Sequence, residues 1–131
     1  MRLKPIALTA AILVAGHAVA QPALKAAPKP SGQNQCFRQS DIESSVQASR
    51  SHLNIKTRDG RYFQIQTKGT CFISPGFDPY VLQIHGSDLA CHPIDIDLSG
   101  ASGGTPMPCI VDKIVPMTKA EALALPKRER P

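Results

Sequence analysis

Four cysteines lie downstream of an apolar N-terminal stretch, all between Cys36 and Cys109, and they constrain the fold more than any other feature. An even number of cysteines in a short exported chain is typical of a disulfide framework, because a small domain buries little apolar surface. A redox-active pair would need a Cys-x-x-Cys spacing, which the sequence lacks. We therefore predict two structural disulfides within one domain.

The first 20 residues have the three regions of a secretory signal peptide. Arg2 and Lys4 supply positive charge, residues 6–15 are almost wholly apolar, and residues 18–20 are the small side chains that signal peptidase requires. The apolar run is shorter than the roughly 20 residues of a membrane span, and no cysteine near the cut could carry a lipid. We predict a periplasmic or secreted protein without a membrane anchor.

Three further segments follow the leader. Residues 21–35, rich in alanine and proline, predict a disordered linker, residues 36–125 predict the disulfide-stabilised domain, and residues 126–131 predict a disordered tail. The formal net charge is +5, but residues 36–117 hold seven basic and eight acidic side chains. The basic excess therefore lies in the leader and the ends, and we predict no nucleic-acid partner.

Alternation with a period of two predicts an antiparallel hairpin in the middle of the chain. Residues 53–57 and 62–67 alternate apolar or β-branched side chains with polar ones on either side of Asp59-Gly60, a pair that readily takes positive φ angles in a tight turn. Residues 41–49 suit either a short helix or a strand, and we favour a strand.

A second pair of strands is expected after a Ser/Pro/Gly-rich loop. Residues 80–85 and 92–98 are the candidates, residues 99–108 predict a long loop, and residues 110–115 predict a strand that pairs with 92–98. The predicted fold class is mainly β, a small antiparallel sheet or partly open barrel stapled by disulfides.

The sequence also predicts a short C-terminal helix. Thr118 and Glu121 have the spacing of a capping box. In this motif the Thr hydroxyl accepts a bond from the backbone N–H of the Glu, and the Glu carboxylate accepts a bond from the backbone N–H of the Thr. We expect the helix to run to Leu125 and to end at Pro126.

Four cysteines permit three disulfide pairings. If residues 92–98 and 110–115 pair as a hairpin, Cys91 and Cys109 fall at its opposite ends, too far apart to bridge. Of the two pairings that remain, we favour Cys71 with Cys91 and Cys36 with Cys109.

Several short motifs occur in a recognisable order along the predicted domain. They are Cys36-Phe37, Gly60-Arg61-Tyr62, the spacing of Cys71, Cys91 and Cys109, and Met117-Thr118 with Glu121. In this order they resemble the bacterial domain-of-unknown-function family 6491, over residues 36 to about 125. The chain departs from the pattern in its few charges at residues 53–57 and its Gly-rich residues 102–105. The resemblance implies a small exported bacterial protein and transfers no catalytic residues.

Two motifs suggest chemistry on first inspection. Gly100 to Gly104 spell the G-x-S-x-G pattern of serine hydrolases, with Ser102 as nucleophile, but Pro106 and Pro108 prevent the helix that this motif needs. Asp95 and Asp97, with Asp112 on a neighbouring strand, could form a carboxylate group, although a solvated sheet face explains the same alternation. We predict no catalytic residues and no enzyme.

Other polar residues could bind a ligand. His85, Asp88, His92 and Asp95 are nitrogen and oxygen ligands close in sequence, which would suit zinc or copper in a metal-handling periplasmic protein. The sequence has no H-x-x-x-H helix and no closed ligand set, and solvent-facing strand histidines explain the same residues, so we predict no cofactor. A separate group, Arg58 and Arg61 with Tyr62 and Tyr80, could contact an anionic glycan or a protein, or could protect a sheet edge.

The sequence therefore favours a non-enzymatic binding or accessory module of the cell envelope, such as an inhibitor of an exported hydrolase, with an envelope protein or glycan as partner. A metal-handling role for His85 and His92 is the alternative.

Overall fold

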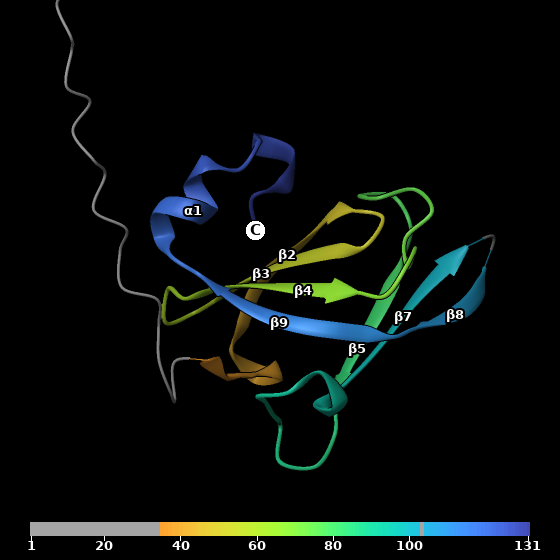
Figure 1. The fold of residues 1–131 in the computed structure, drawn as a ribbon, viewed down its shortest axis with the longest axis horizontal. Coiled ribbons are helices and arrows are strands. Elements are labelled where there is room, and N and C mark those ends of the chain that lie inside the picture. The colour runs from red at the N-terminus through yellow and green to blue at the C-terminus, as the bar shows by residue number, and fades with distance from the viewer. Residues whose placement is uncertain (1–34, 103) are drawn as a thin grey trace, which may run out of the picture.

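The computed structural model describes residues 35–102 and 104–131, so the predicted signal peptide and all of the predicted linker except Gln35 lie outside the described residues. The fold is mainly β, as predicted, and its strands form three antiparallel sheets with a short C-terminal helix (Figure 1). The strands are β1 (Phe37–Arg38), β2 (Ile42–Ser49), β3 (His52–Thr57), β4 (Tyr62–Thr67), β5 (Tyr80–Ile84), β6 (Leu89–Ala90), β7 (Ile96–Ser102), β8 (Thr105–Cys109) and β9 (Val111–Met117).

The largest sheet has the order β2-β3-β4-β9. The predicted hairpin of β3 and β4 is confirmed, and the favoured strand over residues 41–49 is β2. In the hairpin turn only Gly60 takes a positive φ, of 82°. Asp59 contributes differently, because its carboxylate accepts the hydroxyl proton of Thr57 at 2.5 Å. The turn is closed by Gly60 N donating to Thr57 O at 2.8 Å.

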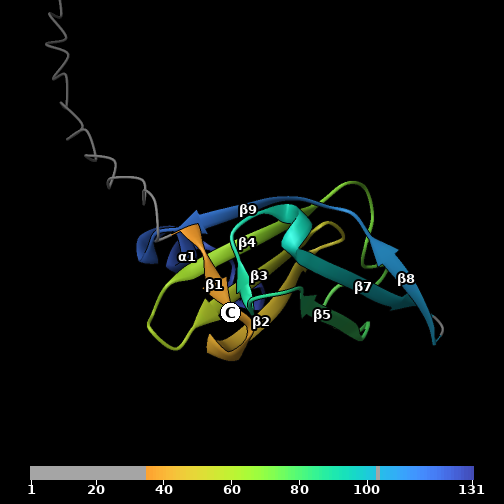
Figure 2. The ribbon, with the colours of Figure 1, turned by 90° about the horizontal axis from the view of Figure 1, so that it is seen from below.

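A smaller sheet has the order β5-β7-β8 and lies beside the first (Figure 2). It includes most of residues 99–108, so the prediction of a long loop there was wrong. The loop was predicted partly from Pro106 and Pro108, because prolines usually interrupt strands. Both lie on the edge strand β8, opposite Ala101 and Ser99, where a missing N–H is tolerated.

Strand β9 follows β8 after Ile110 but joins the other sheet, where it pairs with β4. The predicted pairing of residues 92–98 with 110–115 is therefore wrong. Within the first of these segments, residues 93–95 form a 3₁₀ helix, and β7 begins only at Ile96. Because one continuous stretch, β8 and β9, contributes a strand to each sheet, it ties the two together.

The disulfides join Cys36 to Cys91 and Cys71 to Cys109, so the favoured pairing was wrong. The two-residue strands β1 and β6 explain the first bond. They pair antiparallel with Phe37 opposite Ala90, which places the preceding Cys36 against the following Cys91. Strands this short leave no periodicity in the sequence from which their pairing could be predicted.

The second disulfide attaches the β4–β5 connection to the smaller sheet. Cys71 lies in the connection between β4 and β5, and its carbonyl oxygen would be only 2.4 Å from a Cβ atom at Gly100 of β7. Glycine at this position therefore lets the two backbones approach closely. Cys109, paired with Leu98 of β7, completes the crosslink from the end of β8.

The core fills the space enclosed by the sheets. Leu53 and Ile55 of β3 lie opposite Ile65 and Phe63 of β4, and all four side chains are fully buried. Other sheets and connections complete the cluster with Phe37, Cys71, Phe72, Ala90, Ile96 and Leu98.

The opposite face of the large sheet carries a chain of amides. Gln66 donates to Gln64 at 2.8 Å, Gln64 to Asn54 at 3.0 Å, and Asn54 to the carbonyl of Glu129 at 2.8 Å. Asn54 is fully buried there. The predicted disordered tail is therefore partly wrong, because residues 127–129 form a 3₁₀ helix held on this face.

The predicted capping box at the C-terminal helix α1 (Lys119–Ala124) is present. Glu121 N donates to the Thr118 hydroxyl at 3.2 Å, and Thr118 N donates to the Glu121 carboxylate at 2.7 Å. The helix ends one residue earlier than expected, with Leu125 in an extended conformation.

The edge of β5 is occupied by a side chain. Gln39 donates through Nε2 to the carbonyl of Leu82 at 3.1 Å and accepts from Ile84 N at 3.0 Å. A single glutamine amide thus takes the place of a neighbouring strand at this position.

Candidate functional site

The histidines and aspartates proposed as metal ligands are not gathered in one place. His85 Nε2 lies 2.5 Å from Asp97 Oδ2, whereas His92 lies beside Asp95, with Nδ1 3.5 Å from Oδ2. Asp88 instead accepts the hydroxyl proton of Ser40 at 3.0 Å. Across residues 35–102 and 104–131, no three histidine, cysteine or acidic side chains form a metal-binding group.

Asp95 has a structural role. Its Oδ2 accepts backbone N–H bonds from Cys91 at 2.9 Å and His92 at 2.7 Å, at the start of the 3₁₀ helix. These bonds, with Cys91 the larger contributor, lower the pKa of the Asp95 carboxyl. A stabilised carboxylate is a poor general acid, because it does not hold a proton near neutral pH.

The proposed group of Asp95, Asp97 and Asp112 is not assembled either. Asp95 lies in the 3₁₀ helix before β7, Asp97 contacts His85, and Asp112 on β9 lies 3.8 Å from Lys68 Nζ. The carboxylates therefore have separate partners.

Ser102 is the last residue of β7 and pairs with Thr105 of β8. The surrounding structure is a β-hairpin, whereas a hydrolase nucleophile of this motif lies between a strand and a helix. The G-x-S-x-G pattern therefore lacks the required structural context.

Arg61 and Tyr80, two of the proposed ligand-binding residues, are used inside the fold. Arg61 bonds to Asp59 Oδ2 at 2.6 Å and to the carbonyl of Cys36 at 2.6 Å, and its guanidinium lies 5.4 Å from the centre of the Phe63 ring. The Tyr80 hydroxyl bonds to the Ser45 hydroxyl. Tyr62 is buried, while Arg58 is exposed in the turn. Only Arg58 of this group remains fully on the surface.

A different feature stands out: the loop of residues 73–79 between the second disulfide and β5. Its start is fixed by the Cys71–Cys109 bond and by Cys71 N and Phe72 N, which donate to the carbonyl of Arg50 at 2.7 and 3.0 Å. The loop therefore leaves the core from a crosslinked, hydrogen-bonded base.

The loop also holds its own shape. Ser74 N donates to the Asp78 carboxylate at 2.6 Å, while Phe77 N and Asp78 N both donate to the Ser74 carbonyl at 3.0 and 3.1 Å. Gly76 supplies the one positive φ of the loop, 85°, which glycine adopts without steric cost. These contacts form a compact turn around Phe77.

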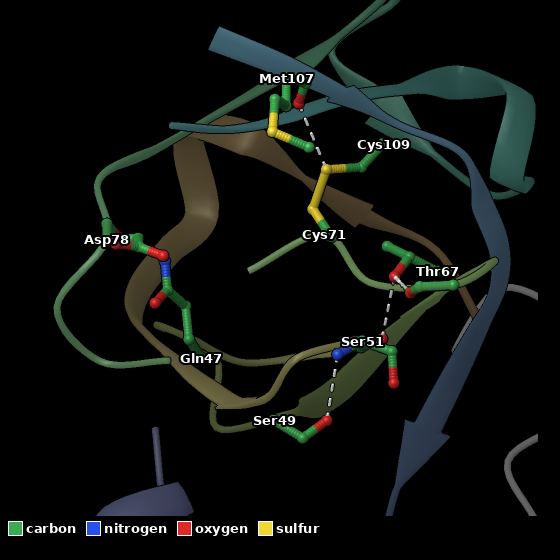
Figure 3. Close-up of a disulfide and its surroundings, with 9 residues drawn as sticks. Gln47, Ser49, Ser51, Thr67, Cys71, Asp78, Met107 and Cys109 are labelled. Atoms are coloured by element: carbon green, nitrogen blue, oxygen red, sulfur yellow. Dashed lines mark hydrogen bonds between the residues drawn. A yellow bond between two sulfur atoms is a disulfide. The ribbon is translucent and has the colours of Figure 1, made fainter. Parts of the chain in front are cut away.

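Gln47 of β2 ties the loop to the large sheet. Its Oε1 accepts from Gly76 N at 2.7 Å, and its Nε2 donates to the Asp78 carbonyl at 2.7 Å. Figure 3 shows the side chain reaching from β2 to Asp78, near the Cys71–Cys109 bond. The Gln47 side chain is almost fully buried, so both of its amide atoms are committed to positioning the loop.

This scaffold presents apolar side chains to solvent. Phe77 is 90% exposed and Ile73 is 45% exposed. Beside the loop lies a hollow of about 540 Å³ lined by Gln47, Ala48, Pro75, Gly76, Phe77 and Arg128. A second hollow along β2 shares Gln47, Gly76 and Arg128 with it and extends to Tyr80. We call these two hollows together the β2 groove.

The sequence predicted a Ser/Pro/Gly-rich loop before the strand at residues 80–85 but gave Phe77 and Gln47 no role. The signal for Phe77 was an aromatic residue among serine, proline, glycine and aspartate. Gln47 gave no signal, because a glutamine in an edge strand resembles any solvent-facing polar residue.

The pKa shifts in the described part of the chain also indicate structural roles. The pKa of Lys56 is raised, mainly by its hydrogen bond to Glu43. The pKa of Glu121 is lowered by bonds from the backbone and side chain of Thr118. Both shifts favour the charged form, which suits ion pairs and caps better than proton transfer.

No protein-family model matches the chain, and neither the curated proteins nor the solved structures contain a match. Among the described helices, none has the length and apolar character needed to cross a membrane. The surface formed by the 73–79 loop and the β2 groove is therefore the candidate site on structural grounds alone.

Proposed function

We propose that this protein is a non-enzymatic binding module of the cell envelope that recognises a partner protein through the 73–79 loop. The observation that carries the proposal is the combination of a 90% exposed phenyl ring at Phe77 with a backbone fixed by Gln47 and Asp78. Exposed apolar side chains grouped on one surface are typical of interaction sites, and this loop carries both Phe77 and the 45% exposed Ile73.

The rigid backbone supports recognition. Ordering a flexible loop on binding costs free energy, whereas a loop already held in shape loses little freedom. Aromatic side chains are among the commonest energetic anchors of protein interfaces. Phe77 would therefore contribute its apolar area to binding at small entropic cost, and an inhibitor of an exported hydrolase is one protein class with this design.

The proposed location is the periplasm or the exterior of the cell. Disulfides form and persist in oxidising compartments, and all four cysteines of this chain are paired. The leader predicted from residues 1–20 would deliver the chain there. The same crosslinks would help the binding surface to survive proteases of that compartment.

The test is chemical crosslinking of the disulfide-bonded protein in an envelope extract, comparing wild type with Phe77→Ala and Ile94→Ala. Ile94 is a matched control, because it is 87% exposed but lies in the 3₁₀ helix at residues 93–95. We expect Phe77→Ala to lose crosslinked partners that wild type and Ile94→Ala retain, with unchanged thermal stability in both variants. Equal recovery by all three proteins would contradict the proposal.

A further inference from the structure

We infer that the β2 groove receives a carboxylate-bearing segment of the partner protein, with Arg128 as the group that pairs with the carboxylate. This inference rests on the proposed function and adds the chemistry of the bound segment. The groove runs between β2 and the 73–79 loop and is bordered by the C-terminal 3₁₀ helix, which supplies Arg128 to both of its hollows.

The backbone at Arg128 is held in place from two sides. Asn54 donates to the carbonyl of Glu129 at 2.8 Å, and Glu129 N donates to the carbonyl of Pro126 at 2.8 Å. Because Asn54 is fully buried, the helix that carries Arg128 is attached to the sheet. The base of the guanidinium side chain thus has a defined position at the groove.

The guanidinium itself keeps most of its bonding capacity. Its Nε lies 3.5 Å from Glu129 Oε1, and the Arg128 side chain is 86% exposed. A strong charge-assisted bond is about 2.7–2.9 Å long, and a guanidinium offers five N–H donors. Contact with Glu129 through Nε therefore leaves the other guanidinium donors available to a ligand.

The other polar groups of the groove already have partners within the fold. Both amide atoms of Gln47 bond to the loop backbone, the Asp78 carboxylate accepts from Ser74 N, and the Tyr80 hydroxyl bonds to Ser45. Arg128 is consequently the lining residue best able to form an ion pair with a charged group of a ligand. The positive charge of Arg128 favours an anionic group in the occupant.

The expected occupant combines two features. Phe77, Pro75 and Ala48 offer apolar contact along the same groove, so an apolar side chain should accompany the aspartate or glutamate. The guanidinium fork matches a carboxylate in a bidentate geometry. We therefore expect a short protein segment with an acidic residue next to an apolar one.

The test uses a displayed library of random linear peptides, selected on wild type, Arg128→Glu, Lys127→Glu and Phe77→Ala. Lys127→Glu is the matched control, since Lys127 lies in the same 3₁₀ helix but does not line the groove. We expect wild type and Lys127→Glu to enrich acidic residues and Arg128→Glu to lose this enrichment. For a selected peptide, Arg128→Ala should weaken binding about fivefold, at the upper end for exposed ion pairs.

The outcomes distinguish failure of the carboxylate inference from failure of the proposed function. Acidic enrichment that persists in Arg128→Glu, or Phe77-dependent peptides without acidic enrichment, would overturn the inference and leave the proposed function standing. Absence of selected peptides, or peptides indifferent to Phe77→Ala, would overturn both. A wild-type dimer in sedimentation that Phe77→Ala converts to monomer would show that a second copy fills the groove, and would also refute the inference.

Discussion

Removing each disulfide separately tests which forces hold this domain together. In the chain-entropy description, closing a loop of 55 residues through Cys36–Cys91 is worth about 4.2 kcal/mol, and a loop of 38 residues through Cys71–Cys109 about 3.9 kcal/mol. Loop entropy alone therefore predicts nearly equal costs, with the first bond slightly more important.

Packing reverses this order. Cys71 is only 4% exposed and belongs to the core cluster, whereas Cys36 and Cys91 are half-buried. Replacing a buried sulfur by a hydrogen loses about 1 kcal/mol of burial and packing. The double variant Cys71→Ala/Cys109→Ala should consequently lose about 5 kcal/mol, against about 4 kcal/mol for Cys36→Ala/Cys91→Ala.

The assay is urea unfolding of the three oxidised proteins, followed by circular dichroism and compared through both midpoint and slope. Since domains of this size have about 5–15 kcal/mol of stability in total, either loss should move the midpoint strongly. A cost below about 1 kcal/mol for either bond would refute the entropic argument, and a larger loss for Cys36→Ala/Cys91→Ala would refute the packing argument. Peptide mapping that found Cys71 bonded to Cys91 would contradict the structure itself.

Three further predictions concern single residues. Gly100→Ala should cost about 1–3 kcal/mol in urea unfolding, because its Cβ would lie 2.4 Å from the Cys71 carbonyl oxygen; unchanged stability would exclude the close approach. Gln47→Ala leaves Gly76 N and the Asp78 carbonyl unpaired, which costs about 1–3 kcal/mol. The loop should then open more often, so chymotrypsin should cleave after Phe77 about tenfold faster or more. An unchanged cleavage rate would show that Gln47 does not hold the loop. The pKa of Asp59 is lowered from its ordinary value of 3.8, chiefly by the Thr57 hydroxyl and then by Arg61. Its stabilisation is therefore complete above that value and is lost as the pH falls through the folded pKa, so Asp59→Asn should flatten the acid limb of a stability profile, and parallel profiles would contradict this.

The parts of the fold that depend on neighbouring residues were predictable from the sequence. The hairpin of β3 and β4 is specified by alternation and by Gly60, and the helix start by Thr118 and Glu121. In each case the contacts that start the element lie within a few positions of one another: Gly60 with Thr57 in the turn, and Glu121 with Thr118 at the cap. Local propensity and turn geometry are then sufficient.

The parts that depend on distant pairing were not predictable. The Cys36–Cys91 bond follows from β1 and β6, whose two-residue length carries no pattern. The partner of β9 is β4 rather than the adjacent stretch of the chain. Such choices are decided by how whole sheets pack, which a single sequence does not reveal.

The candidate site was hidden for a related reason. The candidate metal ligands are close in sequence, but they contact separate partners, such as Asp97 for His85 and Ser40 for Asp88. Conversely, Gln47 and Asp78 are far apart in sequence and meet only in the folded protein. Proximity along the chain was a poor guide to proximity in space.

The glutamine amide on the edge of β5 limits how this protein can associate. Gln39 already occupies the Leu82 carbonyl and the Ile84 N–H, and two prolines remove donors from β8 at the other side of that sheet. An incoming strand would find no continuous ladder on either side, which disfavours fibril growth from this sheet. Contacts made here with other molecules must then come from side chains rather than from strand addition.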